Sequence, residues 1–320
     1  MSLNRARVLI YHKINDDIWD TQLLSVKSEN FYNQLLYIQE NYEPISLDSL
    51  ISRLKDNNLS GNEVSITFDD GYLDNLSNML PVINSLKIPV TVFIPTNFID
   101  KNDEFWWDKI EQLVIKTKKL KINFSIGKKN YSYRLSDAKE KILAIDNICK
   151  ELKKFTPSEI QHFVKIFHTI SETTLEERRT HLIMGQNDIL KLSNSRLVTI
   201  GSHAHSHTRL SILSKDQQKK EFILSKNLLQ KIIGKDIHFI SYPFGSQIDF
   251  TSETEGLVQN CGYKAGVANI QKDLTVNDRI TAIPRRLVRN WKIDDFISWM
   301  KNPDVSDLES RSLKDRSSKF

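Results

Sequence analysis

Two adjacent carboxylates end a predicted strand early in the chain. Residues 64–68 alternate apolar and small polar side chains, the period-two pattern of a β-strand, and Asp69 and Asp70 follow directly. Two neighbouring carboxylates at a strand end repel each other, so a metal ion, an arginine or a proton must compensate their charge. An isolated Asp-Asp-Gly sequence is more often a helix N-cap with a spare acid. The pair therefore needs partners elsewhere in the chain.

Histidines gather in the segment SHAHSH at residues 202–207. His203 and His207 are four positions apart, which would place both imidazoles on one side of a helical turn, whereas His203 with His205 would require an extended chain. Two histidines and one carboxylate are a common catalytic zinc set that leaves a coordination position open for water. The alternative is an exposed polar loop. Three histidines directly after a predicted buried strand make that alternative less favoured.

The elements that must position these residues alternate between strand and helix. Because βαβα alternation produces a mostly parallel sheet, open or closed into a barrel, we expect an α/β fold. In such barrels the chemistry gathers in the loops after the strands. His12, the two aspartates, the histidine segment and Phe244 all follow predicted strands. The main predicted strands cover residues 7–11, 64–68, 89–94, 197–200, 238–242, 264–268 and 280–288.

Residues of about 101–194 differ in character from the rest. They include the aromatic segment FWWD at 105–108, a lysine-rich hairpin over 121–135, and predicted helices at 137–155 and 157–170. We interpret this region as a mostly helical insertion in a single domain of residues 1–302. The remaining residues, 303–320, are predicted to be a polar tail.

Composition excludes several classes of protein. The chain has 320 residues, 39% of them hydrophobic, and its net charge of +5 comes from lysines spread over predicted helix faces, so we expect no nucleic-acid partner. Two cysteines without CxxC spacing argue against a disulfide scaffold and a thiolate metal site. No apolar window of membrane-spanning length occurs. The N-terminus lacks an apolar leader, so the expected location is cytoplasmic unless a signal was removed.

Three segments, in order, resemble the motifs of the polysaccharide deacetylases, the NodB-homology or carbohydrate esterase family 4 enzymes. TFDDG at 67–71 looks like their first motif, SHAHSH at 202–207 is similar to their second, and SYPFG at 241–245 looks like their third. The resemblance runs from about residue 8 to residue 289, interrupted by the insertion. It implies a distorted, complete or incomplete (β/α)7-type barrel and metal-dependent removal of acetyl groups from N-acetylated sugars.

The resemblance also implies roles for individual residues. Asp69 would be the general base, and Asp70, His203 and His207 would hold a divalent metal, with Zn²⁺ expected and Co²⁺, Ni²⁺ or Fe²⁺ as alternatives. The backbone N–H of Phe244 would face the oxyanion. For Trp107, which lies in the insertion, the alternative to stacking against a sugar ring is a place in the hydrophobic core. The side chains expected to line the substrate pocket are Tyr72, Trp107, Tyr242 and Phe244.

The chain departs from the family pattern at two positions. The third motif usually begins with an arginine, where this chain has Ser241, and the usual late histidine is missing because none follows His238. VLIYH at residues 8–12 looks like the N-terminal Tyr-His segment of biofilm-matrix poly-N-acetylglucosamine deacetylases, so His12 is the expected general acid, with a buried strand cap as the alternative. Arg286 is expected to replace the arginine, with Arg285 as its substitute and a surface position as the alternative.

The leading interpretation is therefore a hydrolase that removes the N-acetyl group from an N-acetylhexosamine unit of a polysaccharide or glycan precursor, giving a free amine and acetate. A catalytically inactive relative that binds glycan is the second interpretation, motivated by the two departures. A related amidohydrolase with a different acyl group or a non-sugar amide is the third. The sequence does not reveal an oligomeric state.

Overall fold

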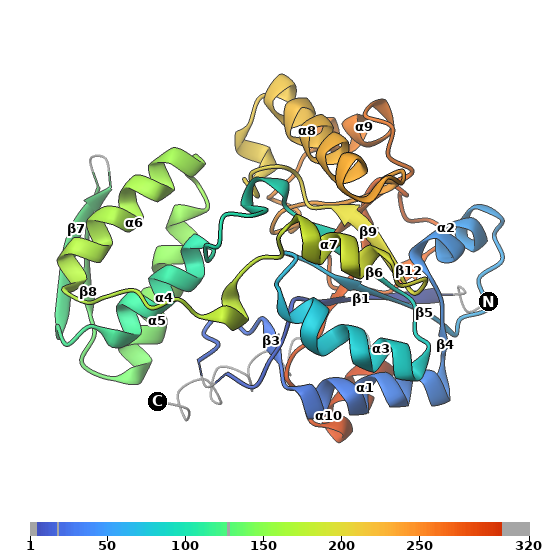
Figure 1. Ribbon diagram of the computed structural model, residues 1–320, viewed down its shortest axis with the longest axis horizontal. Helices are drawn as coiled ribbons and strands as arrows, with labels where there is room; N and C mark the ends of the chain where they lie inside the picture. Colours follow the sequence, from blue (N-terminus) through green and yellow to red (C-terminus); the bar gives the residue numbers. More distant parts are fainter. Residues whose placement is uncertain (1–4, 18, 127–128, 303–320) are drawn as a thin grey trace. The chain divides into compact units, whose positions relative to one another are not determined.

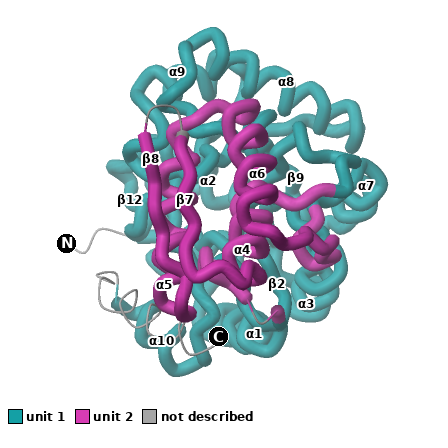
Figure 2. Tube along the Cα trace, turned by 90° about the vertical axis from the view of Figure 1, so that its left-hand side faces the viewer, with its two compact units in different colours: residues 1–16, 24–102, 183–304 teal, residues 17–23, 103–182, 305–320 magenta. Residues whose placement is uncertain are grey.

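The structure is a computed structural model that describes residues 5–17, 19–126 and 129–302. The chain forms two compact units, coloured in Figure 2: unit 1 holds residues 5–16, 24–102 and 183–302, and unit 2 holds residues 17, 19–23 and 103–182. Residues 183–194, which we had placed in the insertion, thus belong to unit 1. The predicted tail of residues 303–320 lies outside the described residues.

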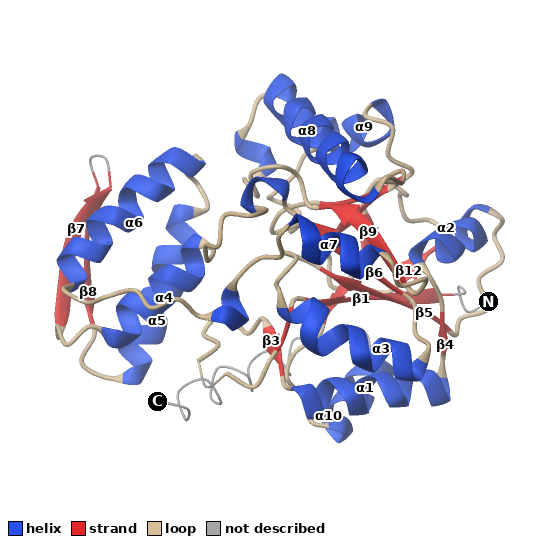
Figure 3. Cartoon of the chain, viewed as in Figure 1, coloured by secondary structure: helices blue, strands red, loops and turns tan. Residues whose placement is uncertain are grey.

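A parallel sheet forms the centre of unit 1 (Figure 3). Its strands pair in the order β1-β5-β6-β9-β10-β11-β13, and β14 pairs in parallel with β1, with Leu9 opposite Arg286. Only Arg285 separates β13 from β14, so residues 283–287 act as one strand that touches both ends of the sheet. This closure confirms the barrel predicted from the sequence. The strands are β1 (Arg5–Tyr11), β5 (Glu63–Phe68), β6 (Val90–Ile94), β9 (Val198–Ser202), β10 (Phe239–Ser241), β11 (Ala265–Ala268), β13 (Ile283–Pro284) and β14 (Arg286–Leu287).

Helices cover the barrel, with α1, α3 and α10 on one side and α8 and α9 on another (Figure 1). All six residues of β5 are buried, as expected for a strand enclosed between the barrel interior and its helices. α8 begins at a capping box of Ser214 with Gln217 and ends at Gly234 in the left-handed conformation. The helices of unit 1 are α1 (Ser28–Asn41), α2 (Leu47–Lys55), η1 (Asn75–Met79), α3 (Leu80–Leu86), η2 (Thr96–Phe98), α7 (Gln186–Ser193), η4 (Leu210–Ile212), α8 (Lys215–Ile233), α9 (Ser252–Asn260) and α10 (Ile293–Lys301).

Short strands complete unit 1. β12 (Leu274–Thr275) runs antiparallel to β1, and β4 (Glu43–Pro44) pairs with β5. β2 (Lys13–Ile14) and β3 (Ser25–Val26) form a separate two-stranded sheet directly after β1. That small sheet begins one residue after His12 and therefore fixes the direction of the chain that leaves the barrel there.

Unit 2 consists of helices packed on an antiparallel hairpin. The hairpin and the helices of residues 138–152 and 157–171 confirm the prediction, whereas the helix of residues 106–116 was not predicted. Phe124 of the hairpin packs against the rings of Phe163 and Phe167, with centroids 5.1 and 5.6 Å away. The elements are α4 (Trp106–Lys116), β7 (Lys121–Ile126), β8 (Lys129–Arg134), α5 (Ala138–Leu152), α6 (Pro157–Ser171) and η3 (Arg179–His181).

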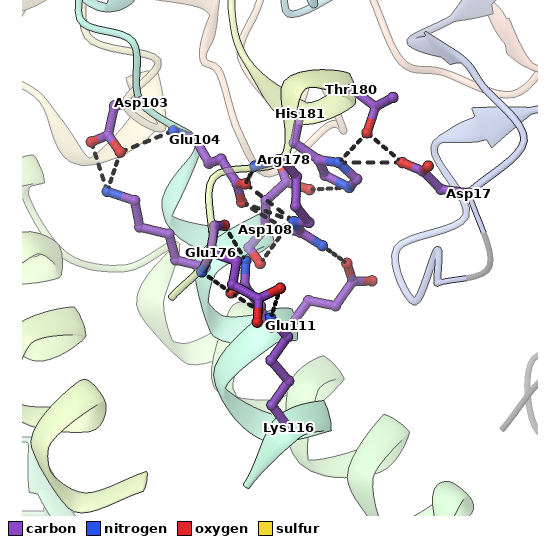
Figure 4. A network of polar contacts seen from close by, with 12 residues as sticks. Asp17, Asp103, Glu104, Asp108, Glu111, Lys116, Glu176, Arg178, Thr180 and His181 are labelled. Carbon is purple, nitrogen blue, oxygen red and sulfur yellow. Dashed lines mark hydrogen bonds and ion pairs between the residues drawn. The ribbon is translucent and has the colours of Figure 1, made fainter. Parts of the chain in front are cut away.

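A buried polar cluster joins the two chain segments of unit 2 that the structure describes, residues 17–23 without residue 18 and residues 103–182 (Figure 4). Arg178 pairs with Glu104 at 2.6 Å and with Glu111 at 3.2 Å, and Glu111 also accepts hydrogen bonds from the backbone N–H and hydroxyl of Thr21 at 2.7 and 2.8 Å. His181 lies 3.4 Å from the carboxylate of Asp17. Since these residues are far apart in the sequence, the cluster fixes the tertiary structure of unit 2.

We expect Glu104→Gln to destabilise unit 2 by about 1–3 kcal/mol, because the Arg178 guanidinium loses the nearer of its two buried counter-charges. Asp103→Asn is the matched control: its carboxylate pairs with Lys109 at the surface and is 51% exposed, so its loss should cost under about 0.5 kcal/mol. Urea unfolding followed by circular dichroism measures both. Equal losses for the two variants would contradict a structural role of the cluster.

Candidate active site

The two aspartates lie where β5 leaves the barrel. The backbone N–H of Asp69 donates to the carbonyl of Tyr11 at 3.0 Å and so extends the pairing between β5 and β1. Asp70 and Gly71 then adopt left-handed conformations, with φ of 72° and 64°. A non-glycine residue at such a φ is strained, and strain of this kind concentrates at functional sites. The turn allows the two carboxylates to take different partners.

His203 and His207 both face Asp70. Their Nε2 atoms lie 3.4 and 3.1 Å from Asp70 Oδ1. His203 Nδ1 donates to the carbonyl of Ser241 at 2.9 Å, because a carbonyl can only accept, and this leaves Nε2 as the ring atom that faces Asp70. The connecting segment is not helical, because Ala204 and His207 have φ of 60° and 54°. The two imidazoles therefore converge through an irregular loop.

This set of donors fits a divalent metal. At metal–ligand distances of about 2.0–2.1 Å, the ligand atoms of a tetrahedral site lie roughly 3.3 Å apart, close to the distances measured here. Burial opposes ionisation of Asp70, but hydrogen bonds with His203 and His207 outweigh it, so the pKa of Asp70 lies well below its usual value. Burial lowers the pKa of His207, whereas the carboxylates of Asp69 and Asp70 overcome burial and raise the pKa of His203. A bound cation would replace the His203 proton.

Asp69 has a different partner. Arg285 binds it with both terminal guanidinium nitrogens, Nη1 to Oδ1 at 2.8 Å and Nη2 to Oδ2 at 2.7 Å, and Arg285 is completely buried. Ser241 donates to Asp69 Oδ2 at 3.0 Å and accepts from Arg285 Nη2 at 2.7 Å, while Thr67 accepts from Nη1 at 2.9 Å. Burial opposes ionisation of Asp69, but Arg285 and His203 lower its pKa. The small side chain at 241 leaves room for the guanidinium that reaches Asp69.

The expectation for Arg286 is therefore wrong. Its guanidinium lies 4.0 Å from the ring centroid of Trp299, pairs with Asp273 at 3.2 Å and binds carbonyl groups at the end of α10. Successive strand residues point to opposite faces, so Arg285 faces the barrel interior while Arg286 faces the helix outside. Arg285, named from the sequence only as a substitute, holds the position.

His12 follows β1 at the same end of the barrel. Its carbonyl accepts a hydrogen bond from Asn75 Nδ2 at 2.8 Å, and its buried Nδ1 has no hydrogen-bond partner among the described residues. Burial lowers the pKa of His12 to about 4, with Arg285 and Arg289 contributing and the two aspartates opposing. The imidazole is thus neutral at neutral pH. Its role as general acid stays a prediction.

Of the aromatic residues expected at the substrate, Phe244 lies at the site. Its ring packs edge-on against the ring of His207 at 4.8 Å, and its φ is 62°. Tyr242 is 1% exposed and donates its hydroxyl to the carbonyl of Thr281, and Tyr72 is completely buried. The expectation that these two tyrosines line an open pocket is therefore wrong, because both rings fill the core of unit 1.

Trp107 belongs to unit 2, where it is 5% exposed and stacks on Phe105 with centroids 4.2 Å apart. Trp107 therefore has the core position that the sequence left as the alternative to stacking against a sugar ring.

A second group of possible metal ligands occurs in unit 2, formed by Asp108, Glu111 and His181. Both carboxylate oxygens of Glu111 already accept hydrogen bonds, Oε1 from Thr21 and Oε2 from Arg178. A guanidinium on the same carboxylate repels a metal ion. We therefore interpret this group as part of the buried ion-pair cluster and assign the candidate metal centre to unit 1 alone.

Comparisons with known proteins agree with this geometry. A family model described as polysaccharide deacetylase matches residues 56–266. "Putative polysaccharide deacetylase YxkH" of Bacillus subtilis (strain 168) is 22% identical over 262 residues, which cover 81% of this chain and 63% of that protein. This chain thus spans less than two thirds of that relative.

None of the helices in the described part of the chain combines the length and apolarity needed to cross a bilayer.

Solved structures share the fold. The Streptococcus pyogenes deacetylase PplD in complex with acetate superposes with a TM-score of 0.61 at 15% identity, covering 94% of this chain and 100% of that one. IcaB from Ammonifex degensii superposes with a TM-score of 0.59 at 14% identity, covering 93% and 98%. With the family match extending over most of the barrel and over all three motifs, the chain belongs to the polysaccharide deacetylase family.

Proposed function

We propose that the protein is a metal-dependent hydrolase that removes the N-acetyl group from an N-acetylhexosamine unit of a polysaccharide or glycan precursor. The observation that carries this proposal is the convergence of Asp70, His203 and His207 beside the separately paired carboxylate of Asp69. A bound divalent metal would polarise the amide carbonyl and lower the pKa of water. The chain's own residues would then supply proton transfer and orientation.

Asp69 is the proposed general base. Its lowered pKa keeps it ionised at neutral pH, and the fork of Arg285 fixes the plane of its carboxylate. It would take a proton from water as the water oxygen bonds to the acyl carbon. The backbone N–H of Phe244, held in a strained conformation beside His207, would donate to the carbonyl oxygen as negative charge develops there.

His12 is the proposed general acid. Breaking the C–N bond releases acetate and leaves an amine that needs a proton. Because the imidazole of His12 is neutral at neutral pH, it must first take up a proton, and the one that Asp69 removes from water is available. Asn75 orients the backbone at His12 through its carbonyl.

Acetate release tests the proposal. The protein, reconstituted with Zn²⁺, Co²⁺, Ni²⁺ or Fe²⁺ in turn, is assayed on N-acetylated sugars from chitooligosaccharides to nucleotide-linked sugars. We expect acetate and free amine in equal amounts, lost on chelation. Glycan binding without acetate release under any metal would favour the inactive relative, and release of formate in place of acetate from matched substrates would favour a different acyl group.

We expect His12→Ala to lower kcat by roughly 10²-fold or more, the usual contribution of general acid–base catalysis, with unchanged metal content. His162→Ala is the matched control, since His162 is exposed on α6 of unit 2. Initial rates with saturating substrate and metal analysis of both variants measure the effect. A wild-type rate for His12→Ala would exclude His12 as the acid.

A further inference from the structure

The loop between the two candidate histidine ligands is held by backbone groups of its middle residues. His205 and Ser206 both direct their N–H groups at one carboxylate oxygen of Glu221, at 2.9 and 2.7 Å. The Ser206 hydroxyl donates to the other oxygen of the same carboxylate at 2.8 Å. Successive N–H groups that enclose an anion next to a left-handed residue form a nest, and here Ala204 supplies the left-handed conformation.

The opposite side of the loop is held by η2. The backbone N–H of Asn97 donates to the carbonyl of His205 at 2.8 Å, and the hydroxyl of Thr96 lies 2.9 Å from His205 Nδ1. Thus the middle of the loop is fixed on both sides while its two ends carry His203 and His207. Glu221 comes from the second turn of α8, so it attaches the loop to a helix outside the barrel.

We propose that Glu221 is a positioning residue that sets the separation of the His203 and His207 imidazoles and thereby the affinity of the metal centre. This inference rests on the proposed function, because it requires that the two histidines bind a metal. The hydrogen bonds that the Glu221 carboxylate accepts from described residues come from His205 and Ser206, both of which lie between the ligands. Without its carboxylate, two adjacent N–H groups lose a charge-assisted acceptor, and the strained conformations of Ala204 and His207 lose a restraint. The loop then relaxes and the two Nε2 atoms no longer face one oxygen of Asp70.

Zn²⁺ affinity, measured by competition with a chromophoric chelator, tests the inference on the full chain. We expect Glu221→Ala to weaken Zn²⁺ binding by roughly 10- to 100-fold, the usual loss when a group that orients metal ligands is removed. Glu221→Gln should lose less, because its carbonyl oxygen still accepts from both N–H groups. Glu253→Ala, which removes an exposed carboxylate from α9, should leave the affinity unchanged.

Circular dichroism and thermal unfolding of the metal-free variants establish that they are folded. If Glu221→Ala fails to fold, Glu221→Gln and Ser206→Ala carry the test, and each should weaken binding. Wild-type affinity in a folded Glu221→Ala protein would overturn the inference. Asp70→Asn separates the two proposals. If Asp70→Asn binds Zn²⁺ with wild-type affinity, the assignment of the metal centre is wrong. If Asp70→Asn loses Zn²⁺ but Glu221→Ala does not, only the positioning role of Glu221 is refuted.

Discussion

Replacing Asp69 by asparagine is expected to reduce acetate release by roughly 10²- to 10⁴-fold, the range measured for the loss of a general base. The amide has the same shape as the carboxylate, but it cannot take a proton from water. Metal binding should persist, because Asp70, His203 and His207 form the candidate centre without Asp69. Acetate release and bound metal are measured on the same preparation.

Asp70→Asn provides the contrast. Both histidines face its carboxylate, so this variant should lose metal and activity together. Unfolding curves are needed for Asp69→Asn because the substitution leaves Arg285 buried without a counter-charge. Wild-type rates in a folded Asp69→Asn protein would show that another group is the base.

The second large effect is expected at Arg285. Arg285→Met leaves the Asp69 carboxylate buried without its partner, and breaking a buried pair in this way costs about 3–5 kcal/mol of folding free energy. Activity should also fall sharply, because the Asp69 carboxylate loses the two parallel hydrogen bonds that fix its plane and keeps the single one from Ser241. Urea unfolding and acetate release measure the two effects.

Arg286→Met is the matched control, since Arg286 is equally buried but binds Asp273 and the end of α10. It should lose stability, while the molecules that remain folded should release acetate at the wild-type rate. A comparable loss of activity per folded molecule in both variants would contradict the assignment of Arg285 to the base.

The barrel and its candidate metal residues could be predicted because both depend on local patterns. Alternating apolar residues identified β5, and the residues directly after a strand must lie at its carboxyl end, which placed Asp69 and Asp70. The spacing of His203 and His207 showed that the two could act together. It did not reveal the loop between them, because left-handed residues such as Ala204 carry no sequence signal.

The predictions that failed, for Arg286, Tyr72 and Tyr242, concern strand register and side-chain packing. Arg285 and Arg286 are adjacent, and the sequence does not say which one faces the barrel interior; that follows from the pairing of β14 with β1. Tyr72 directly follows the first family motif and Tyr242 lies within the third, yet both are buried in the core. One signal in the sequence pointed to the contact between Ser241 and Arg285. A serine where the family usually has an arginine leaves space beside Asp69, and an arginine from another strand can fill that space.

The limits of the insertion were missed for a related reason. Residues 183–194 contain a helix but no strong strand, so the sequence alone assigned them to the helical region. Residues 17 and 19–23 join unit 2 through Thr21 and Glu111, which are 90 positions apart. Contacts at such a separation leave no local pattern.

The closure of the barrel by residues 283–287 determines which part of the chain can be transplanted or expressed alone. A fragment cut at the limits of the family match, residues 56–266, would lack both β1 and the closing strand. It would cut β11 after two of its four residues and expose an edge of β5, where unpaired backbone groups promote aggregation, and it would also lack His12 and Arg285. The smallest fragment that keeps the barrel closed therefore has to carry both ends of the barrel, even though the recognisable motifs lie between them.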